Sequence, residues 1–218
     1  MRQSERSERY EEALQLLGSQ NRTFACSCSR AQLEDELRYP GTCRARSVTA
    51  GMHAATRVRI DPGHIIFTDR IQGTYRQDVA AAVGDITLKR RDHIYAYVLA
   101  VTVDDAAQRV THIVRGADLL DNTPRQIYLQ RLLGLPTPSY AHVPVLTEAD
   151  GSKLAKSRRS MRLAADSPVP QLLFIFSLLG LAPQPSLGLT TISAAWRWAI
   201  AQWHANLVPK RLELRVSD

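Results

Sequence analysis

The sequence lacks the long apolar runs and the cysteine content that would place it in a membrane or in a disulfide scaffold. Its longest apolar segment, Leu172 to Leu181, is interrupted by Ser177 and Gly180 and falls short of the roughly 18 residues that a spanning helix needs. The N-terminus, MRQSERSERYEE, is polar and charged, which excludes a signal peptide. Three cysteines, an odd count in a chain without an export signal, argue against disulfides. We therefore expect a cytoplasmic protein with no membrane partner.

Internal repeats and low-complexity segments are also missing, and what remains is an ordinary globular composition. The 218 residues are 44% hydrophobic and 22% charged, which suffices for a sizeable core in one domain or a domain with an appendage. The net charge is +7, with basic clusters at Lys89–Arg91 and Lys153–Arg162. Such charge favours polyanions, because each neutralised phosphate releases counterions, although on charge alone a solvated basic surface is an equal alternative.

Local patterns in the first half predict one helix and several short strands. Apolar residues from Tyr10 to Leu17 recur at helical spacing, so we expect a helix over Ser4–Ser19 that ends near Gly18. Strands or turns are predicted over Thr23–Cys28, Thr56–Ile60 and Ile65–Thr68, with Asp61-Pro62-Gly63 as a turn. We interpret Val48–Ile86 as a strand-rich insertion.

The centre of the chain has the element order of a doubly wound α/β sheet. The apolar segment IYAYVLAVTVDD, which begins at Ile94, predicts a strand buried on both faces of a parallel sheet. Val110–Val114 predicts a second strand and His142–Leu146 a third. Between these two, Asn122–Leu133 predicts a helix with its N-cap at Thr123, followed by a proline. Strand, helix and strand in this order predict the α/β class.

The remainder of the chain predicts helices over Pro168–Gly180 and Thr191–Ala205. Trp196, Ile200 and Trp203 lie at positions i, i+4 and i+7, which places them on one face of the second helix. We expect this face to belong to the core rather than to stack on a ligand.

Three cysteines and a tyrosine gather in one short segment: Cys26-x-Cys28, ten residues, Tyr39, three residues and Cys43. Three thiolates in one loop can converge on a tetrahedral metal, and soft sulfur ligands select zinc. The fourth ligand is then the phenolate of Tyr39, since a metal lowers the pKa of a bound hydroxyl, or the nearest histidine, His53. The alternative is three reduced cysteines in a small core.

Two further groups of residues have the chemistry of phosphate and carboxylate binding. Asp150-Gly-Ser-Lys153-Leu-Ala-Lys156-Ser sets two lysines in a loop that can close over phosphates, the alternative being an exposed basic loop. Tyr97 in the first central strand and Arg115 at the end of the second fall where open α/β sheets bind ligands. An arginine there can grip a carboxylate with two hydrogen bonds. The alternative is a structural tyrosine and a surface arginine.

In their order along the chain, these segments resemble the glutamyl and glutaminyl branch of the class I aminoacyl-tRNA synthetases. The motifs are Val114-Arg-Gly-Ala-Asp118, Thr123-Pro-Arg-Gln126, His142-Val-Pro144 and Lys153-Leu-Ala-Lys-Ser157, the last being similar to the family's Lys-Met-Ser-Lys-Ser loop. The Cys-x-Cys…Tyr-x-x-x-Cys pattern resembles the zinc site of glutamyl-queuosine tRNA(Asp) synthetases, in which the tyrosine is a ligand. The resemblance extends from Arg2 to Pro209.

The resemblance implies a two-step ligase reaction. ATP, with Mg, and glutamate would give glutamyl-adenylate, and glutamate would then be transferred to queuosine in the anticodon of tRNA(Asp). Tyr97 and Arg115 would hold glutamate, while Lys156, supported by Lys153, would bind ATP and stabilise charge on its phosphates. One structural zinc per chain would be held by Cys26, Cys28, Tyr39 and Cys43. The protein would act as a monomer.

The implied organisation has four parts: 1–25 as the remainder of a first Rossmann half, 26–86 as a zinc-bearing insertion, 87–148 as the second Rossmann half, and 149–218 as the lysine loop with a helical stem region. The family's His-Ile-Gly-His-like ATP signature has no match here, and Ala155 stands where the family often has serine. We therefore expect residues 1–218 by themselves to be inactive in glutamate activation. The alternatives are a fragment of a conventional glutamyl-tRNA synthetase and a non-catalytic RNA-binding remnant.

Overall fold

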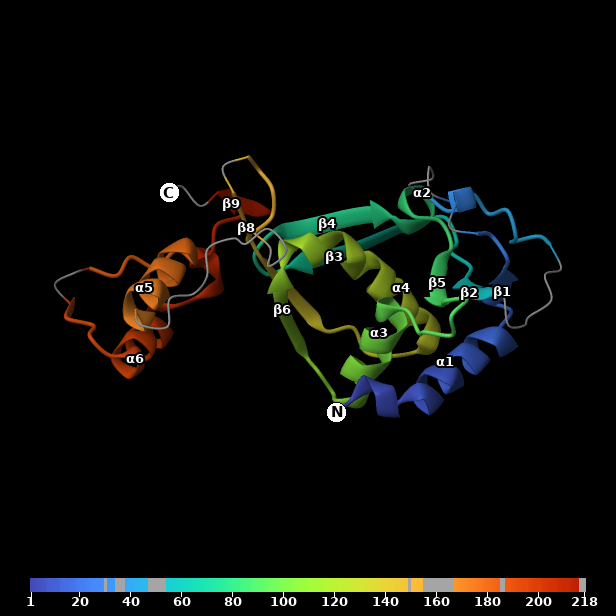
Figure 1. Cartoon of the computed structure of the whole chain (residues 1–218), viewed down its shortest axis with the longest axis horizontal. Coiled ribbons are helices and arrows are strands. Elements are labelled where there is room, and N and C mark those ends of the chain that lie inside the picture. Colours follow the sequence, from blue (N-terminus) through green and yellow to red (C-terminus); the bar gives the residue numbers. More distant parts are fainter. Residues whose placement is uncertain are drawn as a thin grey trace. The chain divides into compact units, whose positions relative to one another are not determined.

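The computed structural model describes residues 1–29, 31–33, 38–46, 54–148, 150–154, 167–184 and 187–215 (Figure 1). The chain divides into two compact units. The first comprises Met1–Phe67, Thr74–Ile113 and Asp121–Ser139, and the second comprises Thr68–Gly73, Val114–Leu120 and Tyr140–Asp218. Within the described ranges, no helix has the length and apolar character that crossing a bilayer requires.

Three helices of the first unit pack against one another: α1 (Ser7–Ser19), α3 (Tyr97–Ala107) and α4 (Thr123–Leu133) (Figure 1). The N-terminal helix confirms the prediction from spacing, since its buried residues are Tyr10, Leu14 and Leu17. It begins at Ser7, after a 3-10 turn at Gln3–Glu5, and runs through Gly18. Helix α4 is also confirmed, although its N-cap is Asn122 rather than Thr123.

A buried carboxylate joins α1 to α3. Asp104 of α3 accepts hydrogen bonds from Tyr10 Oη at 2.8 Å, from Arg6 Nε at 2.5 Å and from Gln3 Nε2 at 3.1 Å. Burial of the Tyr10 ring and its contact with this carboxylate raise the pKa of Tyr10 to about 12. Because a buried charge is costly without partners, these three donors tie α3 to the start of α1 and to the turn before it.

The prediction of a buried strand beginning at Ile94 was wrong, because Tyr97–Ala107 is the helix α3. Val98, Leu99, Ala100 and Thr102 are buried, as is the carboxylate that meets α1. A continuous apolar run does not distinguish a buried strand from a buried helix, and β-branched residues only weakly favour the strand. Packing against α1 and α4 decides the outcome.

The same unit holds a small antiparallel sheet in the order β1-β2-β5, formed by Thr23–Cys26, Ala55–Val58 and Ile86–Lys89. A short helix, α2 (Val79–Ala82), begins at an N-cap formed by the carboxylate of Asp78. Strands β3 (His64–Asp69) and β4 (Gly73–Asp78) pair with each other, and each contributes residues to both units. The predicted strand-rich character of this region is therefore confirmed.

Strand, helix and strand follow one another as predicted in β6 (His112–Gly116), α4 and β7 (Ser139–Val143), and β6 pairs with β7. The predicted third strand is interrupted at Pro144, which lacks a donor for the ladder. Beyond it, β8 (Val145–Thr147) pairs in parallel with β9 (Glu213–Arg215).

The second unit also contains α5 (Pro168–Leu178) and α6 (Ile192–Gln202), which pack together (Figure 1). The prediction that Trp196, Ile200 and Trp203 belong to the core was wrong, because their exposed fractions are 47%, 72% and 45%. Helix α6 instead buries Ala195 and Ala199 against Phe176 and Leu181. Periodicity identifies a face of a helix, but small residues allow two helices to approach closely, and here the fully buried positions of α6 are alanines.

Candidate functional site

Four side chains from one short segment converge in the first unit and are called the thiol cluster here: Cys26, Cys28, Tyr39 and Cys43. Cys26 ends strand β1, and its Sγ lies 3.5 Å from Tyr39 Oη. Cys28 Sγ lies 3.5 Å from Cys43 Sγ, and all three sulfurs lie within 4.8 Å of one another. The structure thus brings together the four residues that the spacing had singled out.

Backbone contacts hold the tyrosine of this cluster in place. The Tyr39 amide donates to the carbonyl of Val83 at 2.9 Å, and its hydroxyl accepts from the amide of Cys43 at 3.0 Å. The guanidinium of Arg57 lies over its ring, with Cζ 3.9 Å from the ring centroid. The ring is 6% exposed, so the hydroxyl is presented to the sulfurs by a fixed framework.

Burial and mutual contact shift the acidity of these groups in different directions. Burial, with the neighbouring thiols, raises the pKa of Cys28 to about 11, and it likewise raises the pKa of Tyr39. Burial also opposes ionisation of Cys43, but hydrogen bonds from Ser27 and Cys28 outweigh it and lower the pKa of Cys43 to about 7. A bound cation would favour the ionised form of every member.

The donor set fits a tetrahedral metal site. Zn–S bonds of about 2.3 Å place two sulfurs of such a site about 3.8 Å apart, which is close to the separation of Cys28 and Cys43. Three sulfurs and one phenolic oxygen supply four ligands, and Cys26, Tyr39 and Cys43 are buried. A site of this kind has no open position for a substrate, which is the arrangement of structural rather than catalytic metals.

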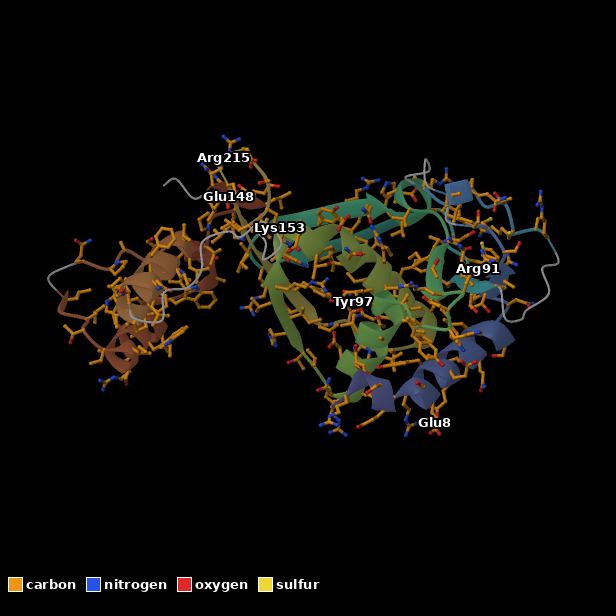
Figure 2. All side chains as sticks on the ribbon, in the orientation of Figure 1. Glu8, Arg91, Tyr97, Glu148, Lys153 and Arg215 are labelled. Atoms are coloured by element: carbon orange, nitrogen blue, oxygen red, sulfur yellow. The ribbon has the colours of Figure 1, made fainter. Side chains whose placement is uncertain are left out.

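A cavity of about 390 Å³ lies beside Tyr39 in the same unit. Tyr97, labelled in Figure 2, is at the first position of α3. It is 53% exposed and lines this cavity. Arg57 and Arg125 also line it, and the Nε atom of each is buried without a hydrogen-bond partner among the described residues. Two guanidinium groups therefore place positive charge in the wall of this cavity.

Arg115 lies in β6 of the second unit, where a chain of hydrogen bonds holds its guanidinium. Its Nε donates to Nε2 of His142 at 3.0 Å, and Nδ1 of His142 lies 2.6 Å from Oδ2 of Asp69. The Arg115 Cζ lies 5.5 Å from the centroid of the Tyr140 ring, and Nη2 lies 3.4 Å from the carbonyl oxygen of Leu119. Both His142 and Asp69 are buried.

Only part of the predicted lysine loop falls within the described residues. Lys153 pairs with the carboxylate of Asp118 and forms an isolated bridge with Thr147 of β8 (Figure 2). Lys156 and Ala155 lie outside the described residues. Sequence reasoning did not single out Asp69, His142, Arg57 or Arg125 as site residues, although His142 and Arg125 belong to motifs that carried the resemblance.

Comparison with protein families identifies the class of the chain. The model for the catalytic domain of class I tRNA synthetases of the E and Q type matches residues 1–182. The chain belongs to this family of ligases.

Within that family, the chain is similar to enzymes that share one name. The chain is 47% identical over 215 residues to the glutamyl-Q tRNA(Asp) synthetase of Pseudomonas fluorescens, which covers 98% of this chain and 72% of the relative. It is 46% identical over 210 residues to the enzyme of the same name from Pseudomonas aeruginosa, with 96% and 71% covered. The resemblance drawn from the motifs is thereby confirmed.

The fold is also similar to solved structures of longer proteins. A glutamate tRNA ligase from Elizabethkingia meningosepticum, in complex with its amino acid, superimposes with a TM-score of 0.73 at 17% identity. The comparison covers 99% of this chain and 51% of that protein, so the chain spans about half the length of this solved structure. At this identity the likeness confirms the α/β synthetase fold alone.

Proposed function

We propose that this protein activates glutamate with ATP and transfers it to queuosine in the anticodon of tRNA(Asp). The observation that carries the proposal is the 45–47% identity, over nearly the whole chain, to relatives named glutamyl-Q tRNA(Asp) synthetase. The basic charge of +7 suits an RNA substrate. We expect the protein to act as a monomer in the cytoplasm.

Arg115 and Tyr97 are the proposed glutamate-binding residues. A guanidinium matches a carboxylate with two parallel hydrogen bonds, and the contacts of Arg115 with His142 and Tyr140 limit its freedom before a ligand arrives. The exposed phenol of Tyr97 supplies a hydroxyl that can donate or accept. Arg115 is thus held in place, and Tyr97 is accessible, before glutamate binds.

Lys153 and Lys156 are the proposed phosphate-binding residues for ATP, which would enter with Mg. In this reading Lys153 leaves the carboxylate of Asp118 when an anionic ligand competes for its ammonium group. Lys156 then stabilises the negative charge that develops on the transferring phosphates. Since exposed ion pairs contribute about 0–1 kcal/mol, exchanging Asp118 for a phosphate is not costly.

The thiol cluster would hold one structural zinc. Bound there, the metal supplies a cross-link between the end of β1 and the segment from Tyr39 to Cys43. This link stabilises the wall of the cavity that contains Tyr39 and Tyr97. The positive charge of Arg57 and Arg125 in that wall suits the anionic backbone of an RNA acceptor.

The proposal is tested with the purified full-length product of the gene. Labelled glutamate is offered with ATP to three RNAs: tRNA(Asp) with queuosine, tRNA(Asp) without it, and tRNA(Glu). We expect incorporation only into the first, and Arg115→Ala to abolish it, while Arg197→Ala, at an exposed position, leaves it unchanged. Robust charging of tRNA(Glu) would instead establish the alternative of a conventional glutamyl-tRNA synthetase.

A further inference from the structure

The hydrogen bonds of His142 are compatible with one protonation state of its ring. The Nε of arginine is always a donor, so Nε2 of His142, 3.0 Å away, must accept and carries no proton. In the neutral imidazole the proton is then on Nδ1, which faces Oδ2 of Asp69 at 2.6 Å. The orientation of the ring and its tautomer are therefore set together.

Asp69 is itself held as a charged acceptor. Its Oδ1 accepts from the backbone amides of Ile71, Gln72 and His142 at 3.0, 2.9 and 3.1 Å, and the residue is 2% exposed. Burial opposes its ionisation, but these hydrogen bonds and that of the His142 ring outweigh burial and lower the pKa of Asp69. With Oδ1 occupied by three amides, only Oδ2 remains for the imidazole.

We propose that Asp69 and His142 are positioning residues that orient the Arg115 guanidinium for glutamate. The proposal rests on the proposed role of Arg115 in glutamate binding. With Nε tied to His142 and Cζ over Tyr140, rotation about the Cδ–Nε bond is restrained, and the two Nη groups keep one plane. A guanidinium fixed before binding loses less conformational freedom when it grips a carboxylate.

A purely structural role for the pair predicts that its substitutions change stability but not ligand preference. The positioning role and the structural role predict different results for two variants, His142→Gln and Asp69→Asn. The glutamine amide oxygen can replace Nε2 as acceptor for Arg115, so this variant should keep the orientation. In Asp69→Asn the amide oxygen takes the three backbone amides, and its NH₂ group then faces Nδ1. The imidazole must move its proton to Nε2, which then opposes the donor of Arg115.

The experiment measures glutamate and ATP affinities by calorimetry for the parent protein and for Arg115→Ala, His142→Ala, His142→Gln and Asp69→Asn. We expect His142→Ala and Asp69→Asn to weaken glutamate binding about tenfold or more, with ATP binding unchanged, because a charge-assisted hydrogen bond is lost. His142→Gln should stay within about threefold of the parent. In the Arg115→Ala background, His142→Ala should add no further loss. The matched control is His112→Ala, at an exposed histidine of the same strand as Arg115.

A second readout does not depend on ligand binding. Nitrogen NMR of residues 1–218 reports the tautomer of His142, which should carry its proton on Nδ1 in the parent and on Nε2 in Asp69→Asn. An Nδ1 proton in both proteins would overturn the proposal, as would unchanged glutamate affinity in His142→Ala beside a large loss in Arg115→Ala. Unchanged affinity in Arg115→Ala would contradict the proposed role of that arginine instead.

Discussion

The thiol cluster differs in its surroundings from a second set of side chains, Trp196 and Ile200 of α6 with Trp203 directly after that helix. Each member of the thiol cluster meets another member or a backbone group at hydrogen-bond distance. These three residues are about half exposed or more, whereas the fully buried residues of α6 are Ala195 and Ala199. A set of distinctive side chains thus identifies a site when its members contact one another, not when they merely share a face.

The largest effect that this comparison predicts follows from replacing one cysteine of the thiol cluster. Protein as purified should contain about one zinc per chain, and Cys28→Ser should lose it together with local stability, because zinc held by three sulfurs contributes directly to folding. Metal analysis with thermal unfolding of both proteins checks this. If carefully prepared parent protein contains no zinc, the cluster is not a metal site and its thiols only form a small core.

A smaller loss of stability is expected when a side chain is removed from the core between α5 and α6. Phe176 is 2% exposed and packs against Leu181, Ala195 and Ala199. Phe176→Ala should lower the free energy of unfolding by about 3–5 kcal/mol, because it leaves a cavity. Urea unfolding measures the change. A loss below about 1 kcal/mol would show that these two helices do not depend on their interface for stability.

A third prediction concerns the close approach of Gly84 to the backbone of Tyr39. Gly84→Ala should lower the free energy of unfolding by about 2–4 kcal/mol, from backbone strain and a steric clash together. Gly84 has a φ of +73°, and a Cβ there would lie 2.5 Å from the Tyr39 carbonyl oxygen. Gly134→Ala is the matched control, since its φ is +65° and a Cβ would meet nothing within 4 Å. Equal losses for the two variants would mean that Tyr39 is not held by this close approach.

The smallest effect is expected on the exposed side of α6. Ile200 is 72% exposed, and serine and isoleucine have similar helix propensities. Ile200→Ser should therefore change the free energy of unfolding by no more than about 0.5 kcal/mol. Thermal unfolding of the variant is sufficient to check this. A loss comparable to that of Phe176→Ala would show that the face is buried after all.

The sequence predicted what depends on local spacing and left open what depends on packing. The gathering of Cys26, Cys28, Tyr39 and Cys43 could be predicted because all four lie in one short segment. The helix α3 could not, since its apolar run suits a buried strand equally well and contacts with distant α1 decide it. The pair of Asp69 and His142 was missed for the same reason, because 73 positions separate the two residues.

The claim on which the account rests is that glutamate is joined to queuosine of tRNA(Asp), and the most direct measurement is the mass of the nucleosides released from that tRNA. The tRNA is incubated with ATP, glutamate and the purified full-length product of the gene, and is then digested. The account predicts a glutamylated queuosine nucleoside that is absent without ATP and absent with Arg115→Ala. Unmodified queuosine in every sample, from protein that is folded and binds glutamate, would contradict it.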